Sequence, residues 1–411
     1  MKDTLKLLGA SNHTDAERSK LDYYGTDPRS TEALLAKEAF DFHIWEPCVG
    51  HHLIADVLDK HGYDVKCSDI AEYEGYAHEV FDFFDYHGEW DGDIGYSYTI
   101  NNCYLTNPED FNEKRYKEYY DYITSRPLIE GVISQNYAPE DDNNIKVGER
   151  VFYTHRNAML IDTYRKAIDD IPEEYRKFFL APLLYEASVH TNTSGVFKGF
   201  YKSKDNIGKF GGDAGNALSR IMGEITLNRP VLSSYSVPFT VYQEDANDLV
   251  KHLKGIDITY LDPPYNQHPY GSNYFMLNTI LENKLGNNIS KVSGIPDDWN
   301  KSVYNQKAEA LKSFEDLVSN LDSKYLIISY NNEGFISLKE MQEMLSKYGR
   351  LTTKAIDYIA FRGSRNFDQR IKEVYEYIFI LKKGEPVNTD IYRVEHQCSD
   401  GSIDVWENTG G

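Results

Sequence analysis

The chain has 411 residues, of which 41% are hydrophobic and 27% are charged, and its formal net charge is −21. This length and apolar content predict a folded protein with a sizeable core, divided into two or three domains. The negative charge argues against a protein that coats nucleic acid with its whole surface, although a local basic groove suffices for an enzyme that acts on DNA.

Neither the cysteines nor the apolar residues point to a metal or a membrane. The cysteines Cys48, Cys67, Cys103 and Cys398 form no C-x-x-C pair, so we expect no disulfide framework and no metal site. No apolar run approaches the roughly 20 residues that cross a bilayer, and the polar N-terminus lacks a signal-peptide core. We therefore expect a cytoplasmic protein with no membrane partner.

The first part of the chain has the pattern of a strand–helix–strand unit. The predicted elements are a polar arm at residues 1–22, a helix at 30–40, a strand at 43–50, a helix at 51–62 and a strand at 63–70. Ser30 is the expected N-cap of the first helix, and Gly62 ends the second. The spacing of the two strands predicts a parallel pair.

Helices dominate the middle of the chain, and strands return after it. The predicted helices are at 109–125, 157–171 and 172–190, followed by strands at 239–245, 257–265, 325–334 and 374–383, with helices at 305–321 and 338–349 between them. The alternation predicts an α/β fold, with a sheet that is interrupted by a mainly helical insertion.

A first candidate site lies in the N-terminal unit. Gly50 occupies a strand-to-helix turn, and Asp69 ends the next strand about twenty residues later, which is the spacing of a site for a nucleoside-containing cofactor. Asp82 and Phe83 offer an acceptor for an adenine amine and a cover for its ring. A tight turn with a helix-capping aspartate is the alternative that this pattern leaves open.

The stretch Asp262-Pro263-Pro264-Tyr265 is more specific. An apolar strand ends at Asp262, and two prolines fix the backbone that follows, so the Asp262 carboxylate and the Pro263 carbonyl can aim at one point. Two such acceptors suit an exocyclic amine, which becomes a nucleophile only when its lone pair is freed from the ring. Tyr265 can stack on an extruded base. A rigid turn with an N-capping aspartate is the plainer alternative.

This stretch resembles the amino-methylation motif of adenine-specific (N6) DNA methyltransferases, the family of Dam-like and restriction-modification methylases. The similarity continues in the same order through residues 150–168, 194–202, 262–280, 325–334 and 374–383. The resemblance implies a Rossmann-like methyltransferase sheet, S-adenosylmethionine as the cofactor, and double-stranded DNA as the substrate. It also implies catalytic roles for Asp262, Pro263, Pro264 and Tyr265.

The N-terminal part is similar to the cofactor half of phage and bacterial S-adenosylmethionine-dependent methyltransferases, over residues 23–35, 44–70 and 82–94. The cofactor-binding residues implied by the two patterns are Tyr24, Thr26, Pro28, Glu46, Pro47, Gly50, Asp69, Asp82 and Phe83. His52 stands where those relatives have a second glycine, and Asn102 and Cys103 stand where a first pair of prolines would be. Asp93 competes with Asp69 for the ribose-binding role, and we favour Asp69 for its spacing from Gly50.

A basic loop inside the helical insertion is the candidate DNA-binding surface. Residues 151–230 hold eleven Lys and Arg against nine Asp and Glu, and residues 194–220 hold five against two. The basic residues of the loop are Lys198, Lys202, Lys204, Lys209 and Arg220. Beside glycines, such residues can follow phosphates; a solvated surface loop is the alternative. Tyr270 and Tyr274, and the arginines Arg362 and Arg365, are further candidates for DNA contact.

These patterns together predict a site-specific DNA adenine methyltransferase that acts on a flipped adenine, in a restriction-modification or phage modification context, with a cognate restriction endonuclease as a possible partner. The predicted parts are an arm at 1–22, a cofactor-binding part at 23–150, a target-recognition insertion at 151–235, a catalytic part at 236–385 and an acidic, disordered tail at 386–411. An RNA adenine methyltransferase, or a non-catalytic DNA-binding protein with a degenerate cofactor site, are the alternatives.

Overall fold

The chain folds into two compact units in a computed structural model. The structure describes residues 43–46, 55–61, 64–69, 79–80, 95–233, 236–299, 301–358, 374–397 and 403–407, with the single positions Glu32 and Leu35. The first unit spans Met1–Trp90, Ala246–Gln267 and Val303–Gly411, and the second spans Asp91–Asp245 and His268–Ser302. The insertion predicted at 151–235 lies within the second unit. None of the described helices is long and apolar enough to span a membrane.

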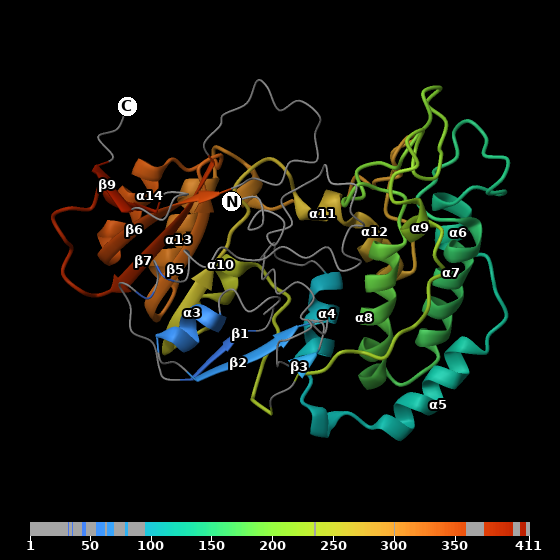
Figure 1. The fold of residues 1–411 in the computed structure, drawn as a ribbon, viewed down its shortest axis with the longest axis horizontal. Helices are drawn as coiled ribbons and strands as arrows, with labels where there is room; N and C mark the ends of the chain where they lie inside the picture. Colours follow the sequence, from blue (N-terminus) through green and yellow to red (C-terminus); the bar gives the residue numbers. More distant parts are fainter. Residues whose placement is uncertain are drawn as a thin grey trace. The chain divides into compact units, whose positions relative to one another are not determined.

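The N-terminal elements of the first unit form a small parallel sheet (Figure 1). Its strands are β1 (His43–Glu46), β2 (Asp64–Asp69) and β3 (Glu79–Val80), and the helix α3 (Ala55–Lys60) lies between β1 and β2 in the chain. β1 pairs in parallel with β2, with Glu46 opposite Cys67. The strand–helix–strand prediction is therefore confirmed.

The rest of the first unit is built on a six-stranded sheet in the order β4-β5-β7-β6-β8-β9. The strands are β4 (Ile256–Leu261), β5 (Ser323–Asn331), β6 (Gly349–Tyr358), β7 (Val374–Lys383), β8 (Arg393–Gln397) and β9 (Ile403–Glu407). β4 and β5 are parallel, and β7 runs antiparallel to both β5 and β6. The carboxyl ends of β4 and β5 therefore meet at one edge of the sheet.

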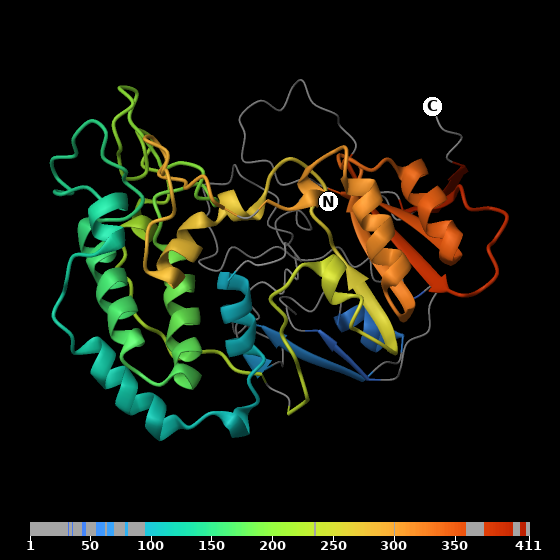
Figure 2. The same ribbon diagram turned by 180° about the vertical axis from the view of Figure 1, so that it is seen from behind.

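Two amphipathic helices pack on one face of this sheet (Figure 2). They are α13 (Ala310–Asn320) and α14 (Leu338–Leu345), and the shorter elements of this part are α10 (Ala246–Leu249), η2 (Val303–Asn305) and η3 (Ser346–Tyr348). α14 begins at Ser337, whose side chain accepts from the Glu340 amide while the Glu340 carboxylate accepts from the Ser337 amide. Such a capping box satisfies donors that a helix start leaves unpaired.

The sheet corrects three expectations. Strands β6, β8 and β9 were not predicted. The strand predicted at 239–245 is wrong, because these residues run without a sheet partner in the structure. The expectation of a disordered tail is also wrong for 393–397 and 403–407, since β8 pairs with β6 and β9 pairs with β8.

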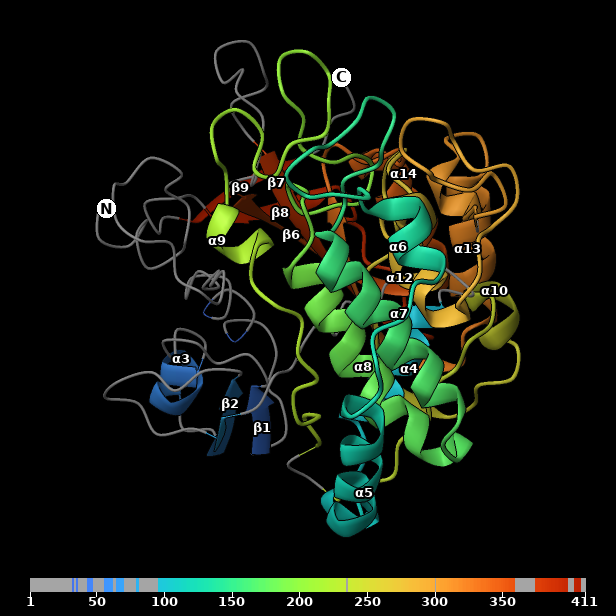
Figure 3. The same cartoon turned by 90° about the vertical axis from the view of Figure 1, so that its right-hand side faces the viewer.

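The second unit is mainly helical, as the sequence predicts for 157–190. Its helices are α4 (Gly95–Tyr104), η1 (Pro108–Asp110), α5 (Glu113–Thr124), α6 (Val132–Tyr137), α7 (His155–Asp169), α8 (Glu173–Val189), α9 (Leu218–Ile221), α11 (Tyr270–Asn273) and α12 (Phe275–Glu282). α4, α7, α8 and α12 pack together (Figure 3). Their core is rich in aromatic rings, such as the Tyr116–Phe179 pair, which stacks at 4.8 Å between centroids.

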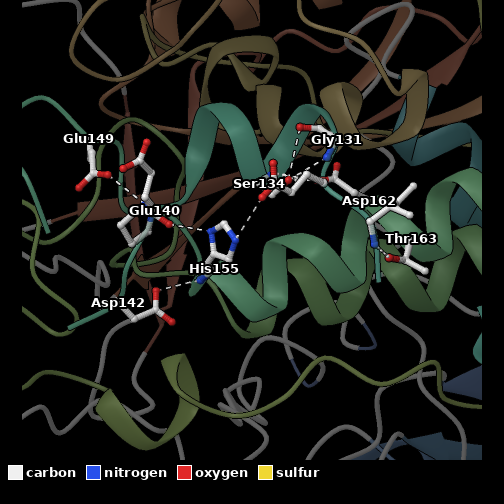
Figure 4. Close-up of polar contacts among 11 residues, drawn as sticks. Gly131, Ser134, Glu140, Asp142, Glu149, His155, Asp162 and Thr163 are labelled. Atoms are coloured by element: carbon white, nitrogen blue, oxygen red, sulfur yellow. Dashed lines mark hydrogen bonds and ion pairs between the residues drawn. The ribbon is translucent and has the colours of Figure 1, made fainter. Parts of the chain in front are cut away.

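A buried carboxylate joins α7 to the start of α6 (Figure 4). Asp162 is 3% exposed, and its oxygens accept from the amides of Ile133 and Ser134 at 2.9 and 2.8 Å and from the Ser134 hydroxyl at 2.6 Å. Burial raises the pKa of Asp162, against the lowering effect of these donors. One turn of backbone is therefore held by a single side chain from another helix.

The N-terminus of α7 is fixed by a second set of contacts in the same region (Figure 4). The His155 amide donates to the Asp142 carboxylate at 2.9 Å, and the His155 ring nitrogen Nδ1 lies 2.8 Å from the Pro139 carbonyl oxygen. Thr154 caps the helix by accepting from the Asn157 amide. A loop of 17 residues, 138–154, is thus anchored where it enters α7.

Candidate active site

The predicted catalytic turn begins where β4 ends. Leu261 is the last residue of β4 and lies opposite Ile328 of the parallel strand β5, so Asp262 emerges at the carboxyl edge of the sheet. Asp262 and Pro263 are half-buried, and Pro264 is buried. Because neither proline has a backbone amide donor, strand β4 cannot continue through the turn. This edge is where open α/β sheets place their ligands.

The loop after β5 holds the turn from the side. The Phe335 amide donates to the Tyr265 carbonyl oxygen at 2.8 Å. The Tyr265 ring meets the Tyr330 ring edge-on at 6.2 Å, and the Tyr330 hydroxyl accepts from the Ile336 amide at 3.1 Å. Burial raises the pKa of Tyr330, so its hydroxyl stays neutral. The position of Tyr265 is therefore set by backbone and ring contacts of a neighbouring strand.

The far end of the turn is tied to η2. The Asn305 amide group donates to the Asn266 carbonyl oxygen at 2.7 Å. The neighbouring Tyr304 is buried, and its hydroxyl donates to Asn247 at 2.7 Å. The backbone of the predicted catalytic turn is thus fixed at two consecutive carbonyl groups, those of Tyr265 and Asn266.

Gly334 is the glycine on which this arrangement depends. Its amide donates to the Asn331 carbonyl oxygen at 3.0 Å, which turns the chain back toward Tyr265. A Cβ atom at Gly334 would lie 2.3 Å from the Tyr330 ring, closer than any real contact. Only a residue without a side chain lets the loop and the ring approach in this way.

We expect Gly334→Ala to lower the methylation rate by about tenfold or more, because the displaced Tyr330 ring would release Tyr265 and its loop. The measurement is the single-turnover rate with the protein in excess over DNA. Gly384→Ala on the loop after β7 is the matched control, since nothing lies within 4 Å of its added Cβ, although its positive φ carries its own backbone cost. Equal rates for Gly334→Ala and the wild type would contradict this role.

A polar cluster that sequence analysis missed lies on the strands beside Asp262. Ser329 and Asn331 are on β5, and both donate to the carboxyl group of Glu376 on β7. Burial raises the pKa of Glu376; the hydrogen bonds from Ser329 and Asn331 oppose this rise, and the charge of Asp262 adds to it by the smallest contribution. In the sequence, the sign of this cluster is a glutamate inside the apolar run 374–381. Only the register of β5 and β7 shows that this glutamate lies beside the end of β5.

The predicted cofactor-binding residues are described in part. Glu46 ends β1 and Asp69 ends β2, and the parallel register brings both backbone positions to the same edge of the small sheet. The remaining ones lie outside the described residues: Tyr24, Thr26, Pro28, Pro47, Gly50, Asp82 and Phe83, together with His52 and Asp93. Asn102 and Cys103 lie within α4, with Cys103 fully buried, so this stretch forms no second strand-end turn.

The basic residues predicted to bind DNA differ in their surroundings. Lys198 is exposed, with its Nζ 3.2 Å from the His268 ring, and Lys202 lies over the Phe200 ring. The exposed Lys204 is fixed through its amide, which donates to Asp213.

Two of the predicted DNA-binding residues have structural partners. Lys209 pairs with Asp213 at 3.0 Å, and Arg220 donates to the carbonyl oxygens of Val189 and Thr193. Sequence alone could not separate them from Lys198 and Lys204. Arg362 and Arg365 lie outside the described part of the chain.

Two tyrosines of the second unit follow the Asp262–Tyr265 turn in the chain. Tyr270 and Tyr274 stack with an interplanar angle of 7° and 5.8 Å between centroids, and Tyr274 also contacts Tyr96. The Phe197 amide donates to the Asn273 carbonyl oxygen at 2.7 Å, which joins the basic loop to α11. The basic loop is thus hydrogen-bonded to α11, the helix that begins at Tyr270 and ends just before Tyr274.

Comparisons with known proteins show the family of the chain. The sequence model of the D12 class N6 adenine-specific DNA methyltransferases matches residues 96–344. The chain is 30% identical over 296 residues to the type II methyltransferase M.NlaIII of Neisseria lactamica, covering 70% of this chain and 82% of that protein.

Two further relatives come from a virus and a bacterium. The type II methyltransferase M.CviAII of Paramecium bursaria Chlorella virus 1 is 33% identical over 298 residues, covering 70% of this chain and 80% of its own. The type II methyltransferase M.FokI of Planomicrobium okeanokoites is 28% identical over 295 residues, covering 69% of this chain and 42% of its own. With the Asp-Pro-Pro-Tyr turn placed at the end of β4, the chain belongs to the D12 class of N6 adenine-specific DNA methyltransferases.

Proposed function

We propose that the turn Asp262–Tyr265 is where this adenine-specific DNA methyltransferase methylates the N6 amine of a flipped adenine. The observation that carries the proposal is the position of the turn, at the carboxyl end of a parallel strand and held by Phe335 and Tyr330. A turn that is only a loop between two elements would not require such support from the neighbouring strand.

The chemistry follows from the two acceptors of the turn. The Asp262 carboxylate and the Pro263 carbonyl accept the two hydrogens of the amine, which draws its lone pair out of conjugation with the ring. The fixed φ angles of the prolines keep the two acceptors in place without a competing amide donor. Tyr265 stacks on the extruded base, and this stacking offsets part of the few kcal/mol that extrusion costs.

The residues placed on the small sheet fit S-adenosylmethionine. Glu46 and Asp69 stand at the carboxyl ends of adjacent parallel strands, where carboxylates suit ribose hydroxyls, and Asp69 keeps the spacing from Gly50 that favours it over Asp93. S-adenosylmethionine supplies an electrophilic methyl group on its sulfonium. Tyr24, Thr26, Pro28, Pro47, Asp82 and Phe83 complete the proposed cofactor site.

We further propose that the two sheets of the first unit belong to one Rossmann-like sheet. β4 is an edge strand in the six-stranded sheet, yet Ile258 and Tyr260 on it are 52% and 54% exposed. Edge strands with large exposed side chains usually meet another element. β1 is an edge strand of the small parallel sheet and carries Ile44 and Trp45, so it suits the free edge of β4.

The second unit is the proposed target-recognition part. Its basic loop is joined to α11, directly after the catalytic turn in the chain, so bases and phosphates can be bound by neighbouring segments. Lys198, Lys202 and Lys204 are the proposed phosphate contacts. Lys209 and Arg220 support the loop through their protein partners instead.

We expect Lys198→Ala and Lys204→Ala each to weaken DNA binding about two- to fivefold and to lower the salt slope by about one, because each removes one phosphate contact. The measurement is the dissociation constant at several salt concentrations. Lys117→Ala on α5 is the control, since Lys117 pairs with Asp121 on the same helix. An unchanged slope for both loop variants would contradict the assignment.

The relatives support a restriction-modification context. Several are named type II methyltransferases, so we propose a cognate endonuclease as the functional partner of this chain. A DNA substrate also supports a cytoplasmic location.

The deciding experiment is transfer of a tritiated methyl group from S-adenosylmethionine to unmethylated DNA, with matched RNA in parallel, followed by nucleoside analysis. N6-methyladenine from DNA is the expected result. Labelling of the RNA alone would favour the RNA enzyme. DNA binding without any transfer would favour a non-catalytic protein.

A further inference from the structure

Three polar side chains near the catalytic turn share one face of the six-stranded sheet. Ser329 and Asn331 are two residues apart on β5, and Asn331 lies directly opposite Glu376 on the antiparallel strand β7. Side chains alternate between faces along a strand, so all three point to the same side. The helices α13 and α14 pack on the opposite face, against Leu326, Ile328 and Tyr330.

The register brings Asp262 to this same side. Leu261 of β4 lies opposite Ile328 of β5, and Asp262 and Ser329 are the residues that follow this last pair in the two segments. Burial is the main cause of the raised pKa of Glu376, and the charge of Asp262 adds the smallest contribution. The catalytic aspartate of the proposed reaction therefore has a second carboxyl group two strands away, on the same face and at the same edge.

The hydrogen bonds of Glu376 fix its position. The Ser329 hydroxyl donates to Oε1 at 2.6 Å, and the Asn331 amide group donates to Oε2 at 3.3 Å. Ser329 and Asn331 are buried, and Glu376 is half-buried. Buried polar groups in such a network are costly to leave unpaired, so the network holds the end of β5 rigidly.

We propose that Glu376 is a positioning residue for methyl transfer, which holds the end of β5 beside the turn through its two hydrogen bonds. This inference rests on the proposed function of Asp262. The end of β5 that is held in this way carries Tyr330, whose ring contacts the Tyr265 ring of the turn.

Two other charged side chains share this face of the sheet. Lys354 of β6 is a diagonal neighbour on the same face, since Ile356 is the residue opposite Glu376. Glu395 of β8 lies opposite Lys354, one strand farther from Asp262. Glu395 therefore serves as a matched control for removal of a carboxylate from this face.

The test uses the full-length protein and measures the single-turnover methylation rate and the dissociation constant for the same DNA. Glu376→Ala leaves Ser329 and Asn331 without their acceptor, and its methylation rate should fall about tenfold or more while the dissociation constant changes little. Glu376→Gln keeps an acceptor for Ser329, so it should recover most of that rate. Glu395→Gln should leave the rate unchanged.

A second readout needs no activity. Glu376→Ala should lower the free energy of unfolding more than Glu376→Gln does, because only the alanine leaves the donors of Ser329 and Asn331 without an acceptor. The pKa of Glu376 is raised in the folded protein, so the stability of the wild type relative to Glu376→Gln should fall as pH rises from the unfolded pKa to the raised value, and should stay level above it.

The outcomes are distinguishable. A methylation rate of Glu376→Ala close to that of the wild type, or equal losses in Glu376→Ala and Glu376→Gln, would overturn the positioning role. A wild-type chain that methylates nothing would remove the proposed function. The stability comparison would then still decide whether the hydrogen bonds of Glu376 hold the end of β5.

Discussion

The Asp262→Ala variant should lose methylation by at least about a thousandfold while keeping most of its DNA affinity. The carboxylate supplies one of the two acceptors that activate the amine, and such an acceptor acts in the transition state far more than in binding. The measurements are the single-turnover rate and the dissociation constant for the same DNA. A large loss of rate with a small change in affinity is the expected pair of results.

The control for this substitution lies on the same strand. Asp257 of β4 is exposed and pairs with Lys324 at 2.5 Å, five residues before Asp262. Removing an exposed ion pair changes stability little, so Asp257→Ala should methylate at close to the wild-type rate. Retained activity in Asp262→Ala would refute the mechanism. Equal losses in both variants would show damage to β4 rather than to the chemistry.

The parts of the sheet that sequence analysis predicted are those with a clear apolar pattern. β5 and β7 carry apolar runs and β4 alternates apolar with polar residues, and their flanking turn residues mark the ends, so their existence and their order in the chain follow from pattern alone. The turn Asp262–Tyr265 was found for the same reason, because a strand end and two prolines are both visible in the sequence.

The missed strands depend on pairing rather than on pattern. β6 includes Thr353 and Lys354, which are polar yet buried between neighbouring strands. β8 and β9 are short and carry several charged residues, and they are strands because β6 offers an edge. The segment 239–245 is the converse case: its β-branched and aromatic residues favour a strand, but no partner strand pairs with it in the structure.

The supporting residues of the site were beyond sequence reasoning for a related reason. Gly334 matters because a ring from β5 approaches it, and Glu376 matters because the register of β7 brings it beside Asn331. The first fact concerns the folding of a short loop back onto its own strand. The second concerns the distance between residues that are about forty-five positions apart in the chain. The basic loop shows the same limit, since composition counted Arg220 with Lys198 although Arg220 is engaged with backbone carbonyls.

The Asp162→Ala variant should lower the stability of the helical unit by about 3 kcal/mol or more, because three donors at the start of α6 would lose their only observed carboxylate partner. Two of these donors are backbone amides of Ile133 and Ser134, which no rotamer change can redirect. The measurement is hydrogen exchange of a peptide that covers residues 131–137, together with thermal unfolding. Exchange at α6 should accelerate more than exchange at α8.

Ser134→Ala is the graded control: it removes the hydroxyl, which donates to Asp162 and accepts from the Gly131 amide at 2.8 Å, and it leaves the carboxylate bonded to the two amides. It should cost about 1 to 2 kcal/mol, a fraction of the Asp162→Ala effect. Asp162→Asn separates charge from hydrogen bonding: burial raises the folded pKa of Asp162, so wild-type stability relative to Asn should fall as pH rises from its unfolded pKa. If Asp162→Ala and Ser134→Ala were equally mild, the carboxylate would not be what fixes the start of α6.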